Sequence, residues 1–130
     1  MRVSAALAFV ATLLSGASAH VCTDKVAVVV TNPAPSCGNS ASNGDTLFVN
    51  YNLTLLSTFK QVDSSDGTPF NFTLGKGQVI KGFDWGLKDT CVGETRTIMI
   101  PPEYGYGNKV VGPIPANSTL IFSVELVKIE

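Results

Sequence analysis

The chain has 130 residues, and its nine lysines and arginines against ten acidic residues give a formal net charge of −1. This length supports one domain with a substantial core and is short for two. Phosphate contacts need clustered Lys and Arg. Because the sequence contains no basic run, we expect no nucleic-acid partner.

The first residues have the pattern of a secretory signal peptide. Arg2 is the only early charge, an apolar run covers residues 3–14, and a group of small residues ends at Ala19. The run is too short to cross a bilayer, and no later run is long enough, so no membrane span is expected. We therefore predict a signal peptide over residues 1–19. The mature chain from His20 would be in the endoplasmic reticulum lumen or secreted, with eight basic and ten acidic residues once Arg2 is removed.

An oxidising compartment changes what the cysteines predict. One disulfide among Cys22, Cys37 and Cys91 is expected, and spacing alone does not choose the pair. Secretion also makes N-glycosylation possible at Asn-x-Thr triplets. The candidate acceptors are Asn52, Asn71 and Asn117.

Residues 20–43 predict one strand followed by a loop. The β-branched run KVAVVVTN, residues 25–32, is typical of a strand, and residues 32–45, rich in Pro, Ser, Asn and Gly, predict a loop. Residues 47–55 alternate apolar and polar side chains, which indicates a strand with one buried face. The sequence VDSSDGTP, residues 62–69, predicts a turn-rich insertion.

The second half of the chain predicts a strand, a short helix and two more strands. Residues 70–74 alternate like a strand, and LGKGQVIKGFDWGL, residues 74–87, has apolar residues at helical spacing. Glycines inside that segment limit the helix to two or three turns. Residues 96–100 predict a strand that stops at two prolines, residues 103–118 a long loop, and residues 119–129 a closing strand. Antiparallel strands with one short helix indicate an α+β domain.

The glycines and lysines of residues 74–87 raise the possibility of a phosphate-binding loop, but their spacing is against it. A Walker-type loop needs Ser or Thr after the Gly75-Lys76 pair, and Gly77 stands there. A dinucleotide-binding loop needs its third glycine where Ile80 stands. We therefore expect no phosphate site in this segment.

Nucleophilic and metal-dependent catalysis find little support. The predicted mature chain has a single histidine, His20, at its start, so no Ser or Cys has a His base inside the domain. Zinc needs more ligands than one His and disulfide-bonded cysteines provide, and a terminal His20 is more often exposed than bound to copper. Asp84 and Asp89 flank the short helix, and we expect both on its solvent-facing side. No metal or cofactor is expected.

Apolar residues near the predicted turns leave a choice between a packed core and an open pocket. Tyr104 and Tyr106 stand among glycines in a loop, where a concave apolar pocket with a few hydroxyls is the alternative to simple packing. For Val79 and Leu87 a packed core is the favoured interpretation.

Three segments resemble the FKBP-type peptidyl-prolyl cis-trans isomerases, the immunophilins that bind macrolides. The segments are FNFTLGKGQVIKGFDWGL, VGETRTIMIPPEYGYG and IPANSTLIFSVELVKIE, and the similarity runs from about Cys37 to Glu130. The resemblance implies the family fold over residues 44–130, a curved antiparallel sheet of about five strands wrapped around one short helix. Cys37 and Cys91 match cysteines of the secreted branch of the family. The resemblance thus implies that these two form the disulfide and that Cys22 is unpaired or bonded to another chain.

The resemblance also implies which residues form the site. Phe83 would be the floor of the pocket, the Tyr106 hydroxyl and the Ile80 N–H would hold a bound carbonyl, and Asp63 would place a carboxylate at the rim. Trp85 is two residues beyond the floor position and is expected to be structural. The implied catalytic set is Tyr51, Asp63, Phe70, Ile80, Phe83, Tyr106 and Phe122, with Val62, Val79 and Ile114 binding substrate.

Differences from the family pattern affect this implied pocket. Val62-Asp63 stands where the family commonly has Phe-Asp, which removes an aromatic ring from the pocket wall. The segment that follows lacks the arginine that often pairs with the aspartate, and the loop before Ile114 is shorter. These differences bear on catalytic efficiency and ligand preference more than on the fold.

The function implied is isomerisation of X-Pro peptide bonds during protein folding in the secretory pathway, without a cofactor. The implied partners are proline-containing polypeptides and macrolides such as tacrolimus or rapamycin, and the protein is expected to be a monomer. Two alternatives stay open: a binding module of the same fold without useful catalysis, and a secreted protein whose apolar cleft binds an unrelated small molecule.

Overall fold

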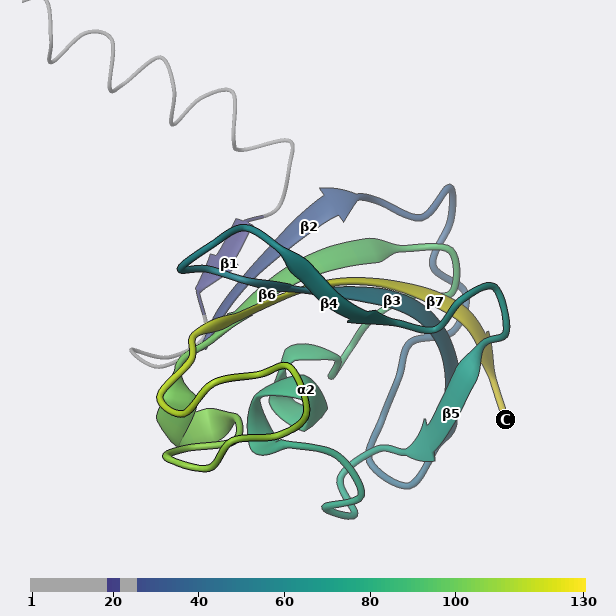
Figure 1. Cartoon of the computed structure of the whole chain (residues 1–130). Helices are drawn as coiled ribbons and strands as arrows, with labels where there is room; N and C mark the ends of the chain where they lie inside the picture. Colours follow the sequence, from purple (N-terminus) through teal and green to yellow (C-terminus); the bar gives the residue numbers. More distant parts are fainter. Residues whose placement is uncertain (1–18, 22–25) are drawn as a thin grey trace, which may run out of the picture.

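A computed structural model of the chain describes residues 19–21 and 26–130, in which a curved antiparallel sheet folds over one short helix (Figure 1). The strands follow the order β1-β2-β6-β7-β3-β4, and β5 pairs with β3 outside this path. Residues 1–18 of the predicted signal peptide, and Cys22, lie outside the described residues. The elements are β1 (Ala19–Val21), β2 (Ala27–Asn32), β3 (Thr46–Leu55), β4 (Gln61–Ser64), β5 (Phe70–Thr73), α2 (Lys81–Gly86), β6 (Thr95–Ile100), the 3₁₀ turn η1 (Pro102–Tyr104) and β7 (Leu120–Ile129).

The α+β class and the curved sheet are confirmed, but the sheet has seven strands within the described residues instead of about five. The short strand β1 adds to the sheet by pairing with β2. Strand β4 lies in the segment predicted as a turn-rich insertion, and it pairs with β3 through Leu53 opposite Asp63 and Asn52 opposite Ser64. Asp is depleted in strands and the strand is only four residues long, so alternation does not reveal it.

The core lies between the concave face of the sheet and helix α2 (Figure 1). Alternation in β3 places Leu47, Val49 and Leu53 inward, each with at most 1% of its surface exposed. Strand β7 alternates in the same way, and its inward residues are buried: Leu120, Phe122, Val124 and Leu126. Full burial of each such side chain contributes about 1.5–3 kcal/mol to folding. These two strands, which pair along nearly their whole length, contribute eight of the 18 residues of the described core cluster.

Helix α2 approaches strand β6 so closely that two glycines are required. A Cβ atom on Gly82 would lie 2.5 Å from Cγ2 of Ile100, and one on Gly86 would lie 2.7 Å from Cδ1 of Ile98. Both isoleucines are fully buried. Glycine in a helix costs about 1 kcal/mol relative to alanine. The close approach therefore explains why two glycines occupy one face of a six-residue helix.

The expectation that Asp84 lies on the solvent-facing side of the helix is wrong. Its side chain is buried, with 7% of its surface exposed. The backbone N–H of Gly75 donates to Asp84 Oδ1 at 2.9 Å, and that of Gly77 donates to Oδ2 at 3.4 Å. Both glycines have positive φ, which turns their N–H groups inward as the chain enters the helix. Asp89, in contrast, is exposed as expected.

The other end of α2 is held by a buried ion pair. Arg96 Nη1 donates to the carbonyl oxygens of Gly86 at 3.0 Å and Lys88 at 2.9 Å, which are free because the helix ends there. Arg96 Nε donates to Glu94 Oε2, whose other oxygen accepts from the Cys91 N–H at 3.0 Å. The cation thus both pairs with a carboxylate and caps the helix carbonyls.

The disulfide implied by the resemblance, Cys37–Cys91, is present, and it joins the loop after β2 to the turn before β6. It encloses a sequence separation of 54 residues, which includes the whole of β3, β4, β5 and α2. A cross-link around a loop of this size constrains the unfolded chain and contributes about 3–5 kcal/mol. In the part of the chain that the structure describes, no helix is long and apolar enough to cross a membrane.

The contact between α2 and β6 gives the first prediction. Gly82→Ala adds a methyl group 2.5 Å from the buried Ile100 side chain. Overpacking of this kind costs about 1–3 kcal/mol. The higher helix propensity of alanine offsets about 1 kcal/mol of that cost. We expect a net loss of up to about 2 kcal/mol in the free energy of unfolding, measured by urea titration.

Gly38→Ala is the matched control, because no atom lies within 4 Å of the position that its added methyl group would take and its φ is not positive. It should leave the free energy of unfolding within about 0.5 kcal/mol of wild type. If Gly82→Ala were as stable as Gly38→Ala, the helix would not be packed on β6 by its backbone as described.

Candidate functional site

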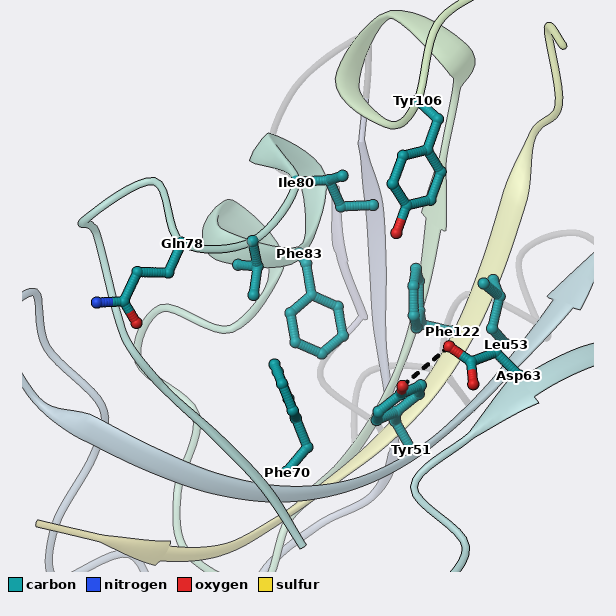
Figure 2. A pocket seen from close by; sticks show the side chains of 10 residues that line it. Tyr51, Leu53, Asp63, Phe70, Gln78, Ile80, Phe83, Tyr106 and Phe122 are labelled. Atoms are coloured by element: carbon teal, nitrogen blue, oxygen red, sulfur yellow. Dashed lines mark hydrogen bonds between the residues drawn. The ribbon is translucent and has the colours of Figure 1, made fainter. Parts of the chain in front are cut away.

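A cavity of about 400 Å³ opens between the concave face of the sheet, helix α2 and the loop that follows β6 (Figure 2). Side chains from β3, β4, β5, β7, the helix entry and this loop converge on it. Most of the lining is apolar or aromatic, as is typical of small-ligand sites. The lining residues are Tyr51, Leu53, Asp63, Phe70, Gln78, Val79, Ile80, Phe83, Tyr106 and Phe122.

Eight of the ten residues implied for the pocket line this cavity, and two do not. Ile114 is buried in the hydrophobic core, with 5% of its surface exposed, and does not line the cavity. Val62 packs against the core and does not line the cavity. The packed-core interpretation is confirmed for Leu87, which is fully buried, whereas Val79 is only partly buried and lines the cavity.

Two lining residues, Leu53 and Gln78, are absent from the site that the sequence predicts. Leu53 lies two positions after Tyr51 on the inward face of β3, so the alternation of that strand could have identified it. Gln78 is held beside the cavity because its Oε1 accepts the N–H of Thr73 at 2.9 Å. This bond links residues on both sides of a glycine-containing turn, and no periodic pattern in the sequence indicates it.

Aromatic rings form the inner wall and the floor. Phe83 is buried, and its ring centroid lies 4.8 Å from that of Phe122 in an edge-to-face arrangement. Tyr51 contacts both rings, with centroids 6.1 Å from Phe83 and 5.9 Å from Phe122. Phe70 meets Tyr51 edge-on at 6.0 Å. Such pairs add about 0.5–1.5 kcal/mol each and fix the shape of an apolar floor.

The polar groups of the cavity lie around this floor. The Tyr51 hydroxyl donates to Asp63 Oδ2 at 3.0 Å, and the Ser64 N–H donates to Oδ1 at 2.8 Å. The Tyr106 hydroxyl points into the cavity (Figure 2) and makes no hydrogen bond with any residue that the structure describes. The Ile80 N–H, at the start of the helix, likewise donates to none of the described residues. Two donors are therefore available to a bound molecule.

The surroundings of the two tyrosines raise their pKa values further above the physiological range. Burial, then the hydrogen bond to Asp63 and the charge of Asp63, raise the pKa of Tyr51 to about 12 from an ordinary value of 10.0. Burial and then the charge of Asp63 raise the pKa of Tyr106 as well. Both hydroxyls can therefore act as hydrogen-bond donors throughout the physiological range.

The described residues offer no group of three or more His, Cys, Asp and Glu side chains placed to hold a metal ion. Trp85 lies outside the cavity, with 43% of its surface exposed and its ring 5.0 Å from that of Tyr104. The side chains of the three candidate glycan acceptors are exposed: Asn52, Asn71 and Asn117. Asn117 lies in the loop that carries Tyr106, and its N–H donates to Gly107 O at 2.8 Å.

The fold and the cavity together define a class of protein: a curved sheet that closes over a short helix to hold a compact apolar group near exposed backbone and hydroxyl donors. The family model described as FKBP-type peptidyl-prolyl cis-trans isomerase matches residues 37–127. The chain belongs to this family and is an enzyme of this type.

Individual relatives agree with this assignment. FK506-binding protein 2 of Emericella nidulans is 52% identical over 104 residues, covering 78% of this chain and 77% of the relative. FK506-binding protein 2 of Aspergillus fumigatus is 53% identical over 96 residues, or 72% of each chain. FK506-binding protein 2 of Dictyostelium discoideum is 47% identical over 108 residues, covering 82% of this chain and 81% of the relative.

The raised pKa of Tyr51 gives the second prediction. The unfolded chain releases this proton near the ordinary value of 10.0, whereas the folded chain keeps it up to about 12. Proton release therefore favours unfolding, and the contribution of Tyr51 to stability is lost as pH rises from 10 towards 12. In Asp63→Asn, the pKa of Tyr51 should fall but stay above 10.0, because burial is the largest cause and remains.

Tyrosine-specific carbon-13 NMR as a function of pH separates Tyr51 from the other two tyrosines and measures these values. The pKa of Tyr106, which the charge of Asp63 also raises, should fall in the same variant. An unchanged Tyr51 titration in Asp63→Asn would contradict the hydrogen bond between them.

Proposed function

We propose that this protein isomerises X-Pro peptide bonds of polypeptides in the secretory pathway, and that the cavity residues described above do so by stabilising a twisted amide. The observation that carries the proposal is the composition of the cavity. Its lining combines an aromatic floor with unpaired hydrogen-bond donors and includes no Ser, Cys, His or Lys side chain. Such a site suits a reaction that rotates a bond and forms none.

The reaction consists of rotation about one peptide bond. Rotation about a peptide bond has a barrier of about 18–20 kcal/mol because the planar amide loses its resonance. An unaided X-Pro bond takes tens of seconds or longer to isomerise, slow enough to limit folding. As the amide twists, its carbonyl loses charge separation and its need for water. An apolar cavity therefore favours the twisted amide over the planar one.

Each part of the cavity has a role in this scheme. The proline ring would pack on Phe83 and Phe122, whose edge-to-face contact forms a floor of the right breadth for a small ring. The Tyr106 hydroxyl and the Ile80 N–H would donate to carbonyl oxygens of the substrate and hold the peptide in a bent geometry. Tyr51, anchored by Asp63, would close the sheet side of the cavity.

The cellular location is part of the proposal. The pattern of residues 1–19 supports entry into the secretory pathway, and the disulfide Cys37–Cys91 suits an oxidising compartment. Glycosylation at the three exposed Asn-x-Thr triplets would fit the same location. The protein would act there as a monomer, on unfolded chains whose prolines are accessible.

Macrolide binding is a second element of the proposal. The names of the relatives state that those proteins bind FK506, which is tacrolimus. The cavity of this chain offers the same kinds of group that the mechanism uses for proline: an apolar floor and two donors. Tacrolimus and rapamycin would therefore occupy the cavity and compete with proline peptides.

One observation favours an alternative, a binding module with weak catalysis. Val62 is absent from the cavity lining, so this position contributes no aromatic ring to the wall. A looser wall would hold the twisted amide less well but accept a bulkier ligand. The substitution Val62→Phe distinguishes the two, since a large gain in turnover would indicate that the natural cavity is adapted to binding.

The third prediction concerns catalysis by the oxidised chain without residues 1–19. Tyr106→Phe removes one hydrogen bond of about 1 kcal/mol, so kcat/KM for a proline peptide should fall about fivefold. Phe122→Ala removes a floor ring and should reduce kcat/KM more than tenfold. A protease-coupled isomerase assay measures both, with circular dichroism to check that Phe122→Ala is folded.

Tyr104→Phe is the matched control, because Tyr104 packs on Trp85 outside the cavity. It should retain wild-type kcat/KM. Unchanged rates in both Tyr106→Phe and folded Phe122→Ala would exclude the cavity as the site of isomerisation.

The fourth prediction concerns macrolides. Rapamycin or tacrolimus should inhibit the isomerase reaction competitively with the proline peptide, and Phe122→Ala should weaken that inhibition. Calorimetric titration measures binding independently of turnover. Tight macrolide binding without measurable isomerisation would favour the binding module, and absence of both would contradict the proposed function.

A further inference from the structure

Asp63 is the single charged side chain among the residues that line the cavity. It lies on β4 at the rim, where it is exposed to solvent, and Figure 2 shows its carboxylate beside the Tyr51 hydroxyl. The other lining residues are apolar, aromatic or amide side chains. The charge of this one carboxylate therefore determines the electrostatic character of the opening.

No cation of the described chain neutralises this carboxylate. Its two oxygens accept hydrogen bonds from neutral groups, the Tyr51 hydroxyl and the Ser64 N–H. The ion pairs of the described residues are elsewhere, between Arg96 and Glu94 and between Lys128 and Glu130. The negative charge at the opening is thus uncompensated.

The groups around Asp63 respond to this charge. It raises the pKa of Tyr51 and of Tyr106, which lie on opposite sides of the cavity, so its field extends across the opening. Asp66, close by in the turn after β4, raises the pKa of Tyr51 in the same direction. Of these two carboxylates, Asp63 has the larger effect on the pKa of Tyr51.

When the proline ring of a substrate lies on the floor, the residues before and after the proline lie at this rim. The ring is joined through one amide to the residue before it and through one carbonyl to the residue after it, so both neighbours leave the cavity at its opening. A lysine or arginine side chain at either position is long and flexible enough to bring its cation to the rim. A glutamate there would meet a like charge.

We propose that Asp63 makes the cavity selective for X-Pro segments with a lysine or arginine next to the proline, and disfavours those with an acidic neighbour. This inference rests on the proposed isomerase function and names the substrate class for it. Because the pair would be exposed, the preference is modest and salt-sensitive, about two- to fivefold for one exposed ion pair. In a client with many prolines, segments with a basic neighbour would therefore be isomerised faster than segments with an acidic neighbour.

The test uses proline peptides that differ at one position. Lys, Gln or Glu is placed directly before the proline in one series and directly after it in a second series. The ratio of kcat/KM for the Lys peptide to that for the Glu peptide is measured at low and high salt, for wild type, Asp63→Asn and Asp89→Asn. A ratio of rates does not depend on any general loss of activity in a variant.

We expect a Lys-to-Glu ratio of about 4–25 for wild type in at least one series, because the attraction of Lys and the repulsion of Glu each contribute about two- to fivefold. The ratio should fall towards 1 at high salt and in Asp63→Asn. Asp89→Asn is the matched control, because it removes one exposed negative charge from a residue that does not line the cavity. Asn also suits its positive φ. This variant should keep the wild-type ratio.

Two results would overturn the inference while leaving the isomerase function intact: equal rates for Lys, Gln and Glu peptides in both series, or a preference that persists in Asp63→Asn. If no peptide of either series is isomerised while the protein is folded, the proposed function fails and this inference fails with it.

Discussion

The direct contact of the helix backbone with strand β6 is the constraint on which the cavity depends. Gly82 and Gly86 lie one turn apart and face Ile100 and Ile98, so the helix axis is fixed close to the sheet. Successive helix residues turn by about 100°. Phe83, which directly follows Gly82, therefore projects to the side, where its ring becomes the floor. A helix set further from the sheet would separate the Phe83 ring from that of Phe122 and disrupt the floor.

A six-residue helix does not persist alone, so its two ends must be held by the rest of the molecule. Asp84 holds the incoming turn through two backbone N–H groups, and Arg96 holds the outgoing carbonyl groups. Each clamp puts a charged side chain in a buried position, and each finds its partners in the backbone next to the helix. The hydrogen bonds to these backbone groups offset the cost of burying the two charges.

The alternating patterns of β3 and β7 reveal those strands from the sequence because each has one apolar face. Alternation does not reveal strand β4, because this strand forms by pairing with an edge of β3 that exists only in the folded sheet. The eight cavity residues that match the implied pocket are indicated by resemblance rather than by periodicity. The sequence misplaces Asp84 because a carboxylate on a short helix normally faces water, and its two backbone donors come from a turn with no periodic signal.

Strand β7 occupies the middle of the sheet between β6 and β3, although it is the last strand of the chain. Its register brings Leu47 opposite Ile129 and Leu55 opposite Leu120, so the early and late parts of the sequence complete one another. Contacts of such long sequence separation form slowly. During synthesis from the N-terminus, β3 and β6 would each present an unpaired edge until residues 120–129 emerge. The sheet is thus complete only once β7, the last of the described strands, has emerged.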